Sequence, residues 1–217
     1  MTKRQTICLA GGVYGAVLMV CILLSLLHFA QDSIARANGT LTTHEMTFAD
    51  FERQDIELLS ENGTAGLTTT EDPQLVLQDL AAAGIGTVRT VEFTITFSKD
   101  PGEVTLYYAK EGEPFAKEKK VWGKRQNDGS YAFTLPRGSD AVGALRIDPT
   151  NQPNVTMQIE QFTFNAPRSF GSYFAFSYEN AFYFIVYPGL AAAFLGYVIT
   201  EFGPVLRKKR AAGKEGK

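Results

Sequence analysis

Apolar residues follow two different patterns along the chain. Near each end lies an uncharged apolar run, Ile7–Ala30 and Ala181–Thr200. A helix of about 20 such residues crosses the roughly 30 Å hydrocarbon core of a bilayer, so each run predicts a membrane-spanning helix. Between the runs, apolar and polar residues alternate with a period of two, which is typical of half-buried β-strands.

The alternation is clearest in Thr87–Phe97, where apolar residues at odd positions from 91 onward are separated by Glu or Thr. Turn residues recur about every ten positions between such segments, which favours an antiparallel β-sandwich. Asp128-Gly129 is predicted to form the tip of a hairpin. Further strands are predicted near residues 46–48, 56–59, 75–77, 104–109, 119–123, 131–135, 144–148 and 155–164.

The stretch 144–164 predicts the closing hairpin of this sandwich. With Leu145 and Ile147 in the core, Arg146 and Asp148 share the opposite face and are expected to form a structural ion pair. In the last strand, apolar residues hold odd positions up to 159 and even positions from 162. This change of phase predicts a β-bulge at Glu160–Gln161.

Charge predicts how the chain is oriented in a membrane. Lys3 and Arg4 precede the first run, and the tail from residue 207 carries six Lys or Arg against Glu215 alone. Residues 31–180 hold 13 Lys and Arg against 21 Asp and Glu, a net charge of −8. The positive-inside rule therefore predicts a two-pass plasma-membrane protein with both termini cytoplasmic. The expected parts are a cytoplasmic N-terminus 1–6, helix 7–30, extracytoplasmic sandwich 31–172, helix 178–206 and basic cytoplasmic tail 207–217.

The first run has a second interpretation, a cleaved secretory signal. Ala35–Ala37 is a small-x-small cleavage pattern, but the apolar core of a signal is usually only about 7–15 residues long. We expect a retained helix, with cleavage left open. The only cysteines, Cys8 and Cys21, lie in this run, so disulfides cannot support the sandwich.

Several segments of the middle region resemble a known family. They are DPQLVL (72–77), VTLYYAKEGEPFAKEKKV (104–121), YAFTLP (131–136) and LRIDPTNQP (145–153). Their order is similar to the jelly-roll, carbohydrate-binding-module-like sandwich associated with bacterial cell-surface polysaccharide glycosyltransferases of the rhamnan-synthesis type. The resemblance covers residues 66–165. It implies a jelly-roll accessory to glycan assembly, with a polytopic glycosyltransferase or a glycan-export protein as partner.

Candidate binding residues are aromatic and acidic. Tyr107, Tyr108 and Trp122 could cover the apolar face of a sugar or could be core residues; consecutive tyrosines in a strand face opposite ways. Asp72 and Asp148 are weak candidates for holding a structural cation. The alternatives are a turn cap for Asp72 and the Arg146 partner for Asp148.

The predicted helices carry small residues four positions apart, Gly11 with Gly15 and Ala192 with Gly196. Such spacing allows close helix packing, whether between the two spans, in a dimer or against a larger membrane protein.

Catalytic chemistry has little support in the sequence. His44 is the one histidine of the middle region, and no spacing selects a pair among its acidic residues. We expect a non-enzymatic protein with no cofactor and no nucleic-acid partner. The leading hypothesis is an accessory that holds its sandwich beside a membrane glycosyltransferase or its glycan. The alternatives are a surface sensor or scaffold acting through the spans and basic tail, and an enzyme using His44.

Overall fold

The computed structural model describes residues 3–59, 64–138, 142–174 and 178–212. The chain forms two compact units. One contains residues 1–31 and 168–217, and the other contains residues 32–167.

The first unit holds most of helix α1 (Lys3–Ala37), the short 3-10 helix η2 (Phe170–Phe174) and helix α2 (Tyr178–Ala212). Both long helices contain a stretch that is long and apolar enough to cross a membrane, Gln5–Ala37 and Phe184–Phe202. Membrane insertion itself stays a prediction.

The two helices meet through other residues than Gly11 and Gly15. The Tyr14 hydroxyl donates a hydrogen bond to the Ile185 carbonyl at 2.8 Å, and a β-carbon at Gly196 would lie 3.8 Å from a Leu9 methyl. A β-carbon at Gly11 or Gly15 would meet nothing within 4 Å. These two glycines therefore do not pack against α2, and a dimer or a larger partner at this face stays a prediction.

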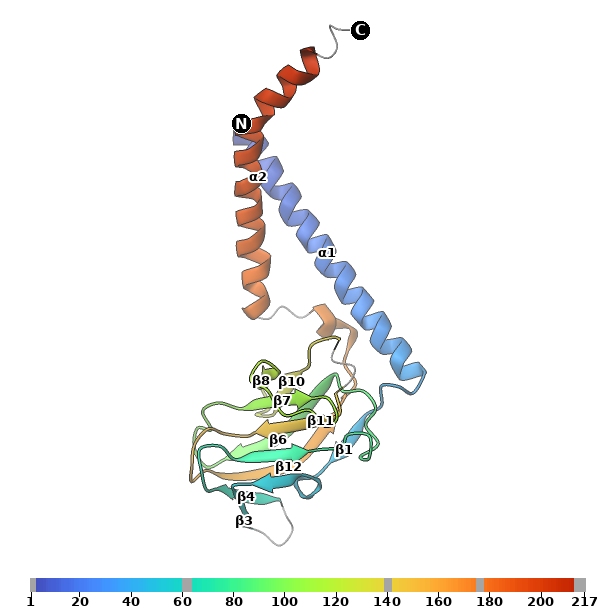
Figure 1. The fold of residues 1–217 in the computed structure, drawn as a ribbon, viewed down its shortest axis with the longest axis vertical. Coiled ribbons are helices and arrows are strands. Elements are labelled where there is room, and N and C mark those ends of the chain that lie inside the picture. The colour runs from blue at the N-terminus through green and yellow to red at the C-terminus, as the bar shows by residue number, and fades with distance from the viewer. Residues whose placement is uncertain (1–2, 60–63, 139–141, 175–177, 213–217) are drawn as a thin grey trace. The chain divides into compact units, whose positions relative to one another are not determined.

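The second unit is a sandwich of two antiparallel sheets, which confirms the predicted architecture (Figure 1). The seven-stranded sheet runs β3 (Ile56–Leu58), β4 (Ala65–Thr68), β12 (Thr156–Phe164), β6 (Thr90–Phe97), β10 (Tyr131–Thr134) and β9 (Lys124–Arg125), with β1 (His44–Met46) also on β12. The five-stranded sheet runs β2 (Glu52–Gln54), β5 (Gln74–Leu77), β11 (Ala144–Asp148), β7 (Thr105–Ala109) and β8 (Lys120–Trp122). A 3-10 turn, η1 (Phe48–Asp50), lies between β1 and β2.

The core between the sheets contains a cluster of stacked aromatic rings among aliphatic side chains. Phe93 of β6 stacks on Phe133 at 5.7 Å and on Phe162 at 5.4 Å between ring centroids. Leu106 and Leu145 of the five-stranded sheet are fully buried in the same cluster. Each fully buried side chain of this size stabilises the fold by about 1.5–3 kcal/mol, so the sandwich is held by apolar burial.

The predicted bulge is present in β12. Ile159 is opposite Ile95, but the next pair joins Gln161 to Thr94, which leaves Glu160 as the extra residue. One inserted residue reverses the alternation, so apolar residues on both sides of the bulge face the core.

The closing hairpin predicted for 144–164 is wrong. β11 belongs to the five-stranded sheet and β12 to the seven-stranded sheet, so the turn between them carries the chain across the sandwich. Thr150 donates to the Pro101 carbonyl at 2.6 Å, and Thr68 donates to the Gln152 carbonyl at 2.9 Å. Alternation alone does not distinguish a hairpin from a crossing, since both bury the same side chains.

A second crossing replaces the hairpin expected between 119–123 and 131–135. β8 pairs with β7, whereas the two-residue strand β9 pairs with β10 around the Asp128-Gly129 turn. The chain changes sheets at Gly123, where a β-carbon would lie 3.0 Å from the Phe133 ring. The close approach of this ring explains the glycine.

Candidate functional site

A row of polar and aromatic side chains crosses the outer face of the five-stranded sheet, the face turned away from the core. Tyr107 of β7 lies opposite Arg146 of β11 on one side and Lys120 of β8 on the other. Directly opposite residues of antiparallel strands share a face, so these three side chains are neighbours. Leu106, the residue before Tyr107, points into the core.

A second row adds the exposed tryptophan. Thr105 lies opposite Trp122 on β8 and opposite Asp148 on β11. The Trp122 side chain is large and the residue is 50% exposed, whereas Thr105 and Asp148 are buried. Tyr107 and Trp122 are thus diagonal neighbours on one face, at a Cα spacing of about 7–8 Å. We call this surface, formed by Tyr107, Lys120, Trp122 and Arg146, the aromatic platform.

Arg146 is the centre of an ion-pair network under the platform. Its Nε donates to Asp148 Oδ1 at 2.7 Å and its Nη2 to Asp148 Oδ2 at 2.8 Å, a bidentate pair between residues two apart on the same strand. Nη2 also donates to Asp72 Oδ1 at 2.6 Å. The expected ion pair between Arg146 and Asp148 is present, and Arg146 also reaches Asp72 in the segment before β5.

The cations also contact the aromatic rings. The guanidinium of Arg146 lies 5.0 Å from the Tyr107 ring centroid, and Lys120 Nζ lies 4.2 Å from the Trp122 centroid. Cations at this range are attracted to the ring faces, which fixes the orientation of both rings.

Burial changes the acid–base properties of the pair. Burial raises the pKa of Asp148 above its usual range, although the hydrogen bonds and charge of Arg146 act against this. For Arg146, burial opposes the charged form, but the hydrogen bonds and charge of Asp148 outweigh it and raise its pKa. Arg146 remains a cation at every working pH.

The weak cation candidates are accounted for by this network. Asp72 and Asp148 are brought together, but the positive group between them is the Arg146 guanidinium. Within the described ranges, no group of three or more His, Cys, Asp or Glu residues could hold a metal ion.

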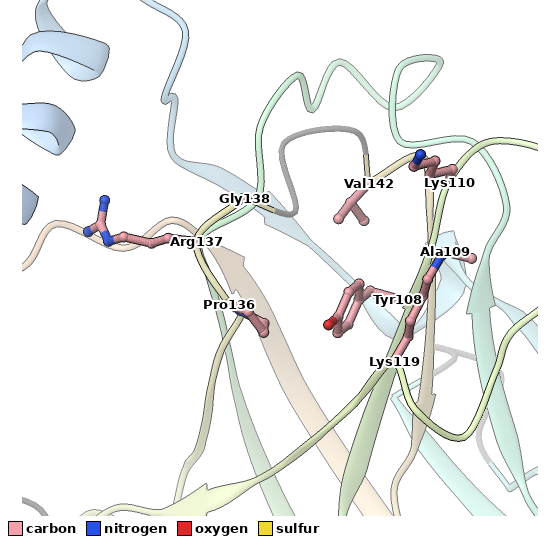
Figure 2. Close-up of a pocket in the computed structure, with 8 residues that line it drawn as sticks. All are labelled: Tyr108, Ala109, Lys110, Lys119, Pro136, Arg137, Gly138 and Val142. Atoms are coloured by element: carbon pink, nitrogen blue, oxygen red, sulfur yellow. The ribbon is translucent and has the colours of Figure 1, made fainter. Parts of the chain in front are cut away.

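Tyr108 lies apart from the platform and lines a cavity of about 320 Å³. Figure 2 shows its ring with Pro136 and Val142, and the Arg137 side chain directed away from them. The other lining residues are Ala109, Lys110, Lys119 and Gly138. The three candidate aromatics therefore form two sites, and no spacing in the sequence could have joined Tyr108 to residues some 30 positions later.

Arg137 is held by the end of α1. Its Nη1 and Nη2 donate to Asp32 Oδ1 and Oδ2 at 2.9 and 2.7 Å, and the Asp32 carboxylate is almost fully buried. Arg36 donates to the carbonyl oxygens of Asn165 and Ala166 at 2.8 and 3.1 Å. The sequence does not predict this cluster, because Asp32 and Arg137 are 105 positions apart and no local pattern joins them.

A polar groove of about 730 Å³ lies over β6 and was also missed. Thr94 and Thr96 line it together with Arg125, Asp128 and Glu160. The alternating threonines of β6 indicate an exposed polar face. The charged residues beside them come from neighbouring segments, so only the pairing of β6 with β10 and β12 reveals the groove.

The side-chain hydrogen bond of His44 does not support a catalytic role. Its Nε2 is hydrogen bonded to the Thr42 hydroxyl at 2.6 Å. A base oriented by a carboxylate, as nucleophilic catalysis requires, is not formed by these two residues.

No protein-family model matches the chain, and no curated protein matches it. Solved structures are similar to the sandwich in fold. A low-affinity xylan-binding module from Roseburia intestinalis is 15% identical and aligns over 57% of this chain and 94% of its own, with a TM-score of 0.37. A β-1,3-glucan-binding module from Bacillus halodurans is 10% identical over 57% and 96% of the two chains, with a TM-score of 0.34. A family two carbohydrate esterase from Cellvibrio japonicus is 9% identical over 57% of this chain but 33% of its own, with a TM-score of 0.35.

Proposed function

We propose that the chain is a membrane-anchored, non-enzymatic glycan-binding protein that presents its sandwich outside the cell. The aromatic platform carries the proposal. Trp122 is half exposed beside Tyr107, and Lys120 and Arg146 orient both rings. A partly exposed aromatic surface with polar groups beside it suits a sugar chain, whose rings have an apolar face and peripheral hydroxyls.

The platform suits an extended polymer better than a small molecule. It is a sheet surface with two rings at a diagonal, so successive sugar units of one chain can contact Trp122 and Tyr107 in turn. The Asp72 carboxylate, which is 64% exposed, lies at the side of Arg146 and can accept hydrogen bonds from sugar hydroxyls.

Intrinsic fluorescence tests the proposal directly, because Trp122 is the only tryptophan of the chain. Full-length protein in detergent would be titrated with xylan and β-1,3-glucan oligosaccharides and with fragments of bacterial surface polysaccharides. Binding at the platform should change the Trp122 emission. Trp122→Ala and Tyr107→Ala, followed by calorimetry, should each lose binding.

The matched control is Leu58→Ala, which truncates an exposed apolar residue on the other sheet. It should bind like the wild type. If no glycan of the panel binds a folded protein, or if Trp122→Ala binds equally well, the platform is not a glycan site.

Membrane anchoring is part of the proposal and rests on the two apolar helices and the charge asymmetry of their flanks. Single cysteines would be placed at Ser98 or Lys209 in a background with Cys8 and Cys21 changed to serine. A membrane-impermeant maleimide should label position 98 but not position 209 in intact cells. Labelling of both, or of 209 alone, would contradict the two-pass orientation.

We further propose that the protein supports surface-glycan assembly beside a polytopic glycosyltransferase or glycan-export protein. The proposal is supported by the resemblance of residues 66–165 to sandwiches associated with bacterial cell-surface polysaccharide glycosyltransferases. Tagged protein purified in a mild detergent should carry such a membrane partner with it. Purification of the chain alone under several mild detergents would count against this role.

A sensor or scaffold is the second candidate, and the Asp32–Arg137 pair favours it. Arg137 lines the cavity beside Tyr108 and binds the end of α1, so a change at the cavity could reach the helix. Replacing the basic tail by a neutral sequence that keeps the topology should abolish a signalling response. A pure accessory should be unaffected by that exchange.

A further inference from the structure

We propose that the cavity beside Tyr108 binds a single hexuronate, a sugar ring carrying a carboxylate. The inference rests on the proposed glycan-binding function but uses a different site. Its residues come from β7, the β7–β8 turn and the segment after β10.

The size of the cavity favours one sugar ring over a chain. Its volume of about 320 Å³ lies at the lower end of small-molecule pockets, which span roughly 300–1,000 Å³. The aromatic platform is an open surface and the cavity is a recess, so the two sites select different parts of a glycan.

One wall of the cavity is apolar. The Tyr108 ring lies with Pro136 and Val142, and its hydroxyl is the polar end of that wall (Figure 2). The wall can cover the apolar face of a pyranose, while the phenol oxygen accepts or donates one hydrogen bond.

The rim supplies positive charge from Lys110 and Lys119, which lie at the two ends of the turn between β7 and β8. Arg137 is not part of this set, since both its terminal nitrogens are bonded to Asp32. A neutral sugar can only accept hydrogen bonds from the ammonium groups through its hydroxyl oxygens, whereas a carboxylate also gains the attraction between opposite charges.

Glu113 shows that Lys119 already pairs with a carboxylate. Lys119 Nζ donates to Glu113 Oε2 at 2.7 Å, and both side chains are substantially exposed. The hydrogen bond from Lys119, followed by the charges of Lys119 and Lys110, lowers the pKa of Glu113 below its usual value. Glu113 therefore pairs with Lys119 from a solvent-exposed turn, and the carboxylate of an incoming uronate would compete with it for that lysine.

Because Glu113 and the ligand compete for Lys119, substitutions of these two residues should change glucuronate binding in opposite directions. Full-length protein in detergent would be titrated by calorimetry with D-glucuronate and with D-glucose, which has a hydroxymethyl group in place of the carboxylate. Glucuronate should bind about tenfold more tightly, as expected for one charge-assisted hydrogen bond in a partly exposed site. Lys119→Met should remove most of that preference, and Glu113→Gln should strengthen glucuronate binding about two- to fivefold because the competitor is gone.

Matched controls separate the cavity from its surroundings. Lys117→Met removes a lysine from the same turn that does not line the cavity and should leave glucuronate binding unchanged. D-Glucose 6-phosphate should bind no more tightly than glucuronate. Tighter phosphate binding, equal binding of glucose and glucuronate, or no gain with Glu113→Gln would each overturn the uronate assignment.

The platform is tested separately by Trp122→Ala. This change should abolish oligosaccharide binding but leave glucuronate binding intact, because Trp122 does not line the cavity. Wild-type protein that prefers glucuronate to glucose but binds no oligosaccharide would refute the proposed function and leave the cavity assignment standing. Wild-type protein that binds oligosaccharides at the platform without preferring glucuronate to glucose would refute only the cavity assignment.

Discussion

Tyr107 and Tyr108 are adjacent in the chain, but they belong to regions of opposite character. Tyr107 lies on an open sheet surface between two cations, with Trp122 beside it. Tyr108 lines a recess whose other residues, apart from Ala109 of β7, come from segments between strands. A single strand thus supports both sites, and its alternation assigns each tyrosine to one of them. Substitutions that affect one site, the other or both test how far the two sites depend on each other.

The largest effect is expected where both sites share their support. Leu106 lies between Thr105 and Tyr107 and is completely buried. Leu106→Ala should lower the free energy of unfolding by about 2–5 kcal/mol and weaken platform and cavity together. Chemical denaturation of the full-length protein followed by Trp122 fluorescence measures it. A loss at only one site would mean that the two faces are independent of their common strand.

The second largest effect is expected when the platform cation Arg146 is removed. Arg146→Met leaves the carboxylate of Asp148, 12% exposed, without its bidentate partner. The unfolding free energy should fall by about 2–3 kcal/mol, below the 3–5 kcal/mol of fully buried pairs. Asp72→Asn is the contrast, because that carboxylate is 64% exposed and its pair should contribute at most about 1 kcal/mol. Equal effects of the two changes would show that the network is not organised around Asp148.

The attachment of α1 should matter to stability but not to uronate recognition. Asp32→Asn leaves the Arg137 guanidinium without its carboxylate partner and should cost about 1–3 kcal/mol. Glucuronate affinity should stay within twofold of the wild type, since Arg137 is not assigned to the ligand. Thermal unfolding and calorimetry of the same preparation provide both values. A large fall in affinity would place Arg137 in the cavity's binding set.

The smallest effect concerns pH and the buried side of the platform. Because the folded-state pKa of Asp148 is raised by burial, the folded protein binds this proton more tightly than the unfolded chain does. The stabilisation from that proton is complete below the usual Asp pKa and is lost as pH rises through the raised value. Relative to Asp148→Asn, the wild type should gain stability as pH falls through this window, which chemical denaturation at several pH values measures. A gain in the opposite direction would mean that Arg146 dominates the pKa.

Much of the sandwich could be predicted because a strand with one buried face shows alternating apolar and polar residues in its sequence. The alternation in 87–97 identified β6, and the change of phase at Glu160–Gln161 identified the bulge. β2 and β4 were missed or misplaced because three- and four-residue strands are too short to show a period. The site was only partly predictable: the aromatic candidates were named, but their separation into two surfaces was not.

The sequence by itself determined which residues of its alternating strands lie inside the sandwich, that two uncharged apolar runs form helices, and that Tyr107 and Tyr108 face opposite ways. These properties depend on local period and on transfer from water, which act through near neighbours in the chain. Only the tertiary structure decided that 144–164 crosses between sheets, that Arg146 joins Asp72 to Asp148, and that Lys110 and Lys119 lie at a cavity with Val142. Such arrangements depend on which strands pair, and several pairings bury the same apolar side chains equally well.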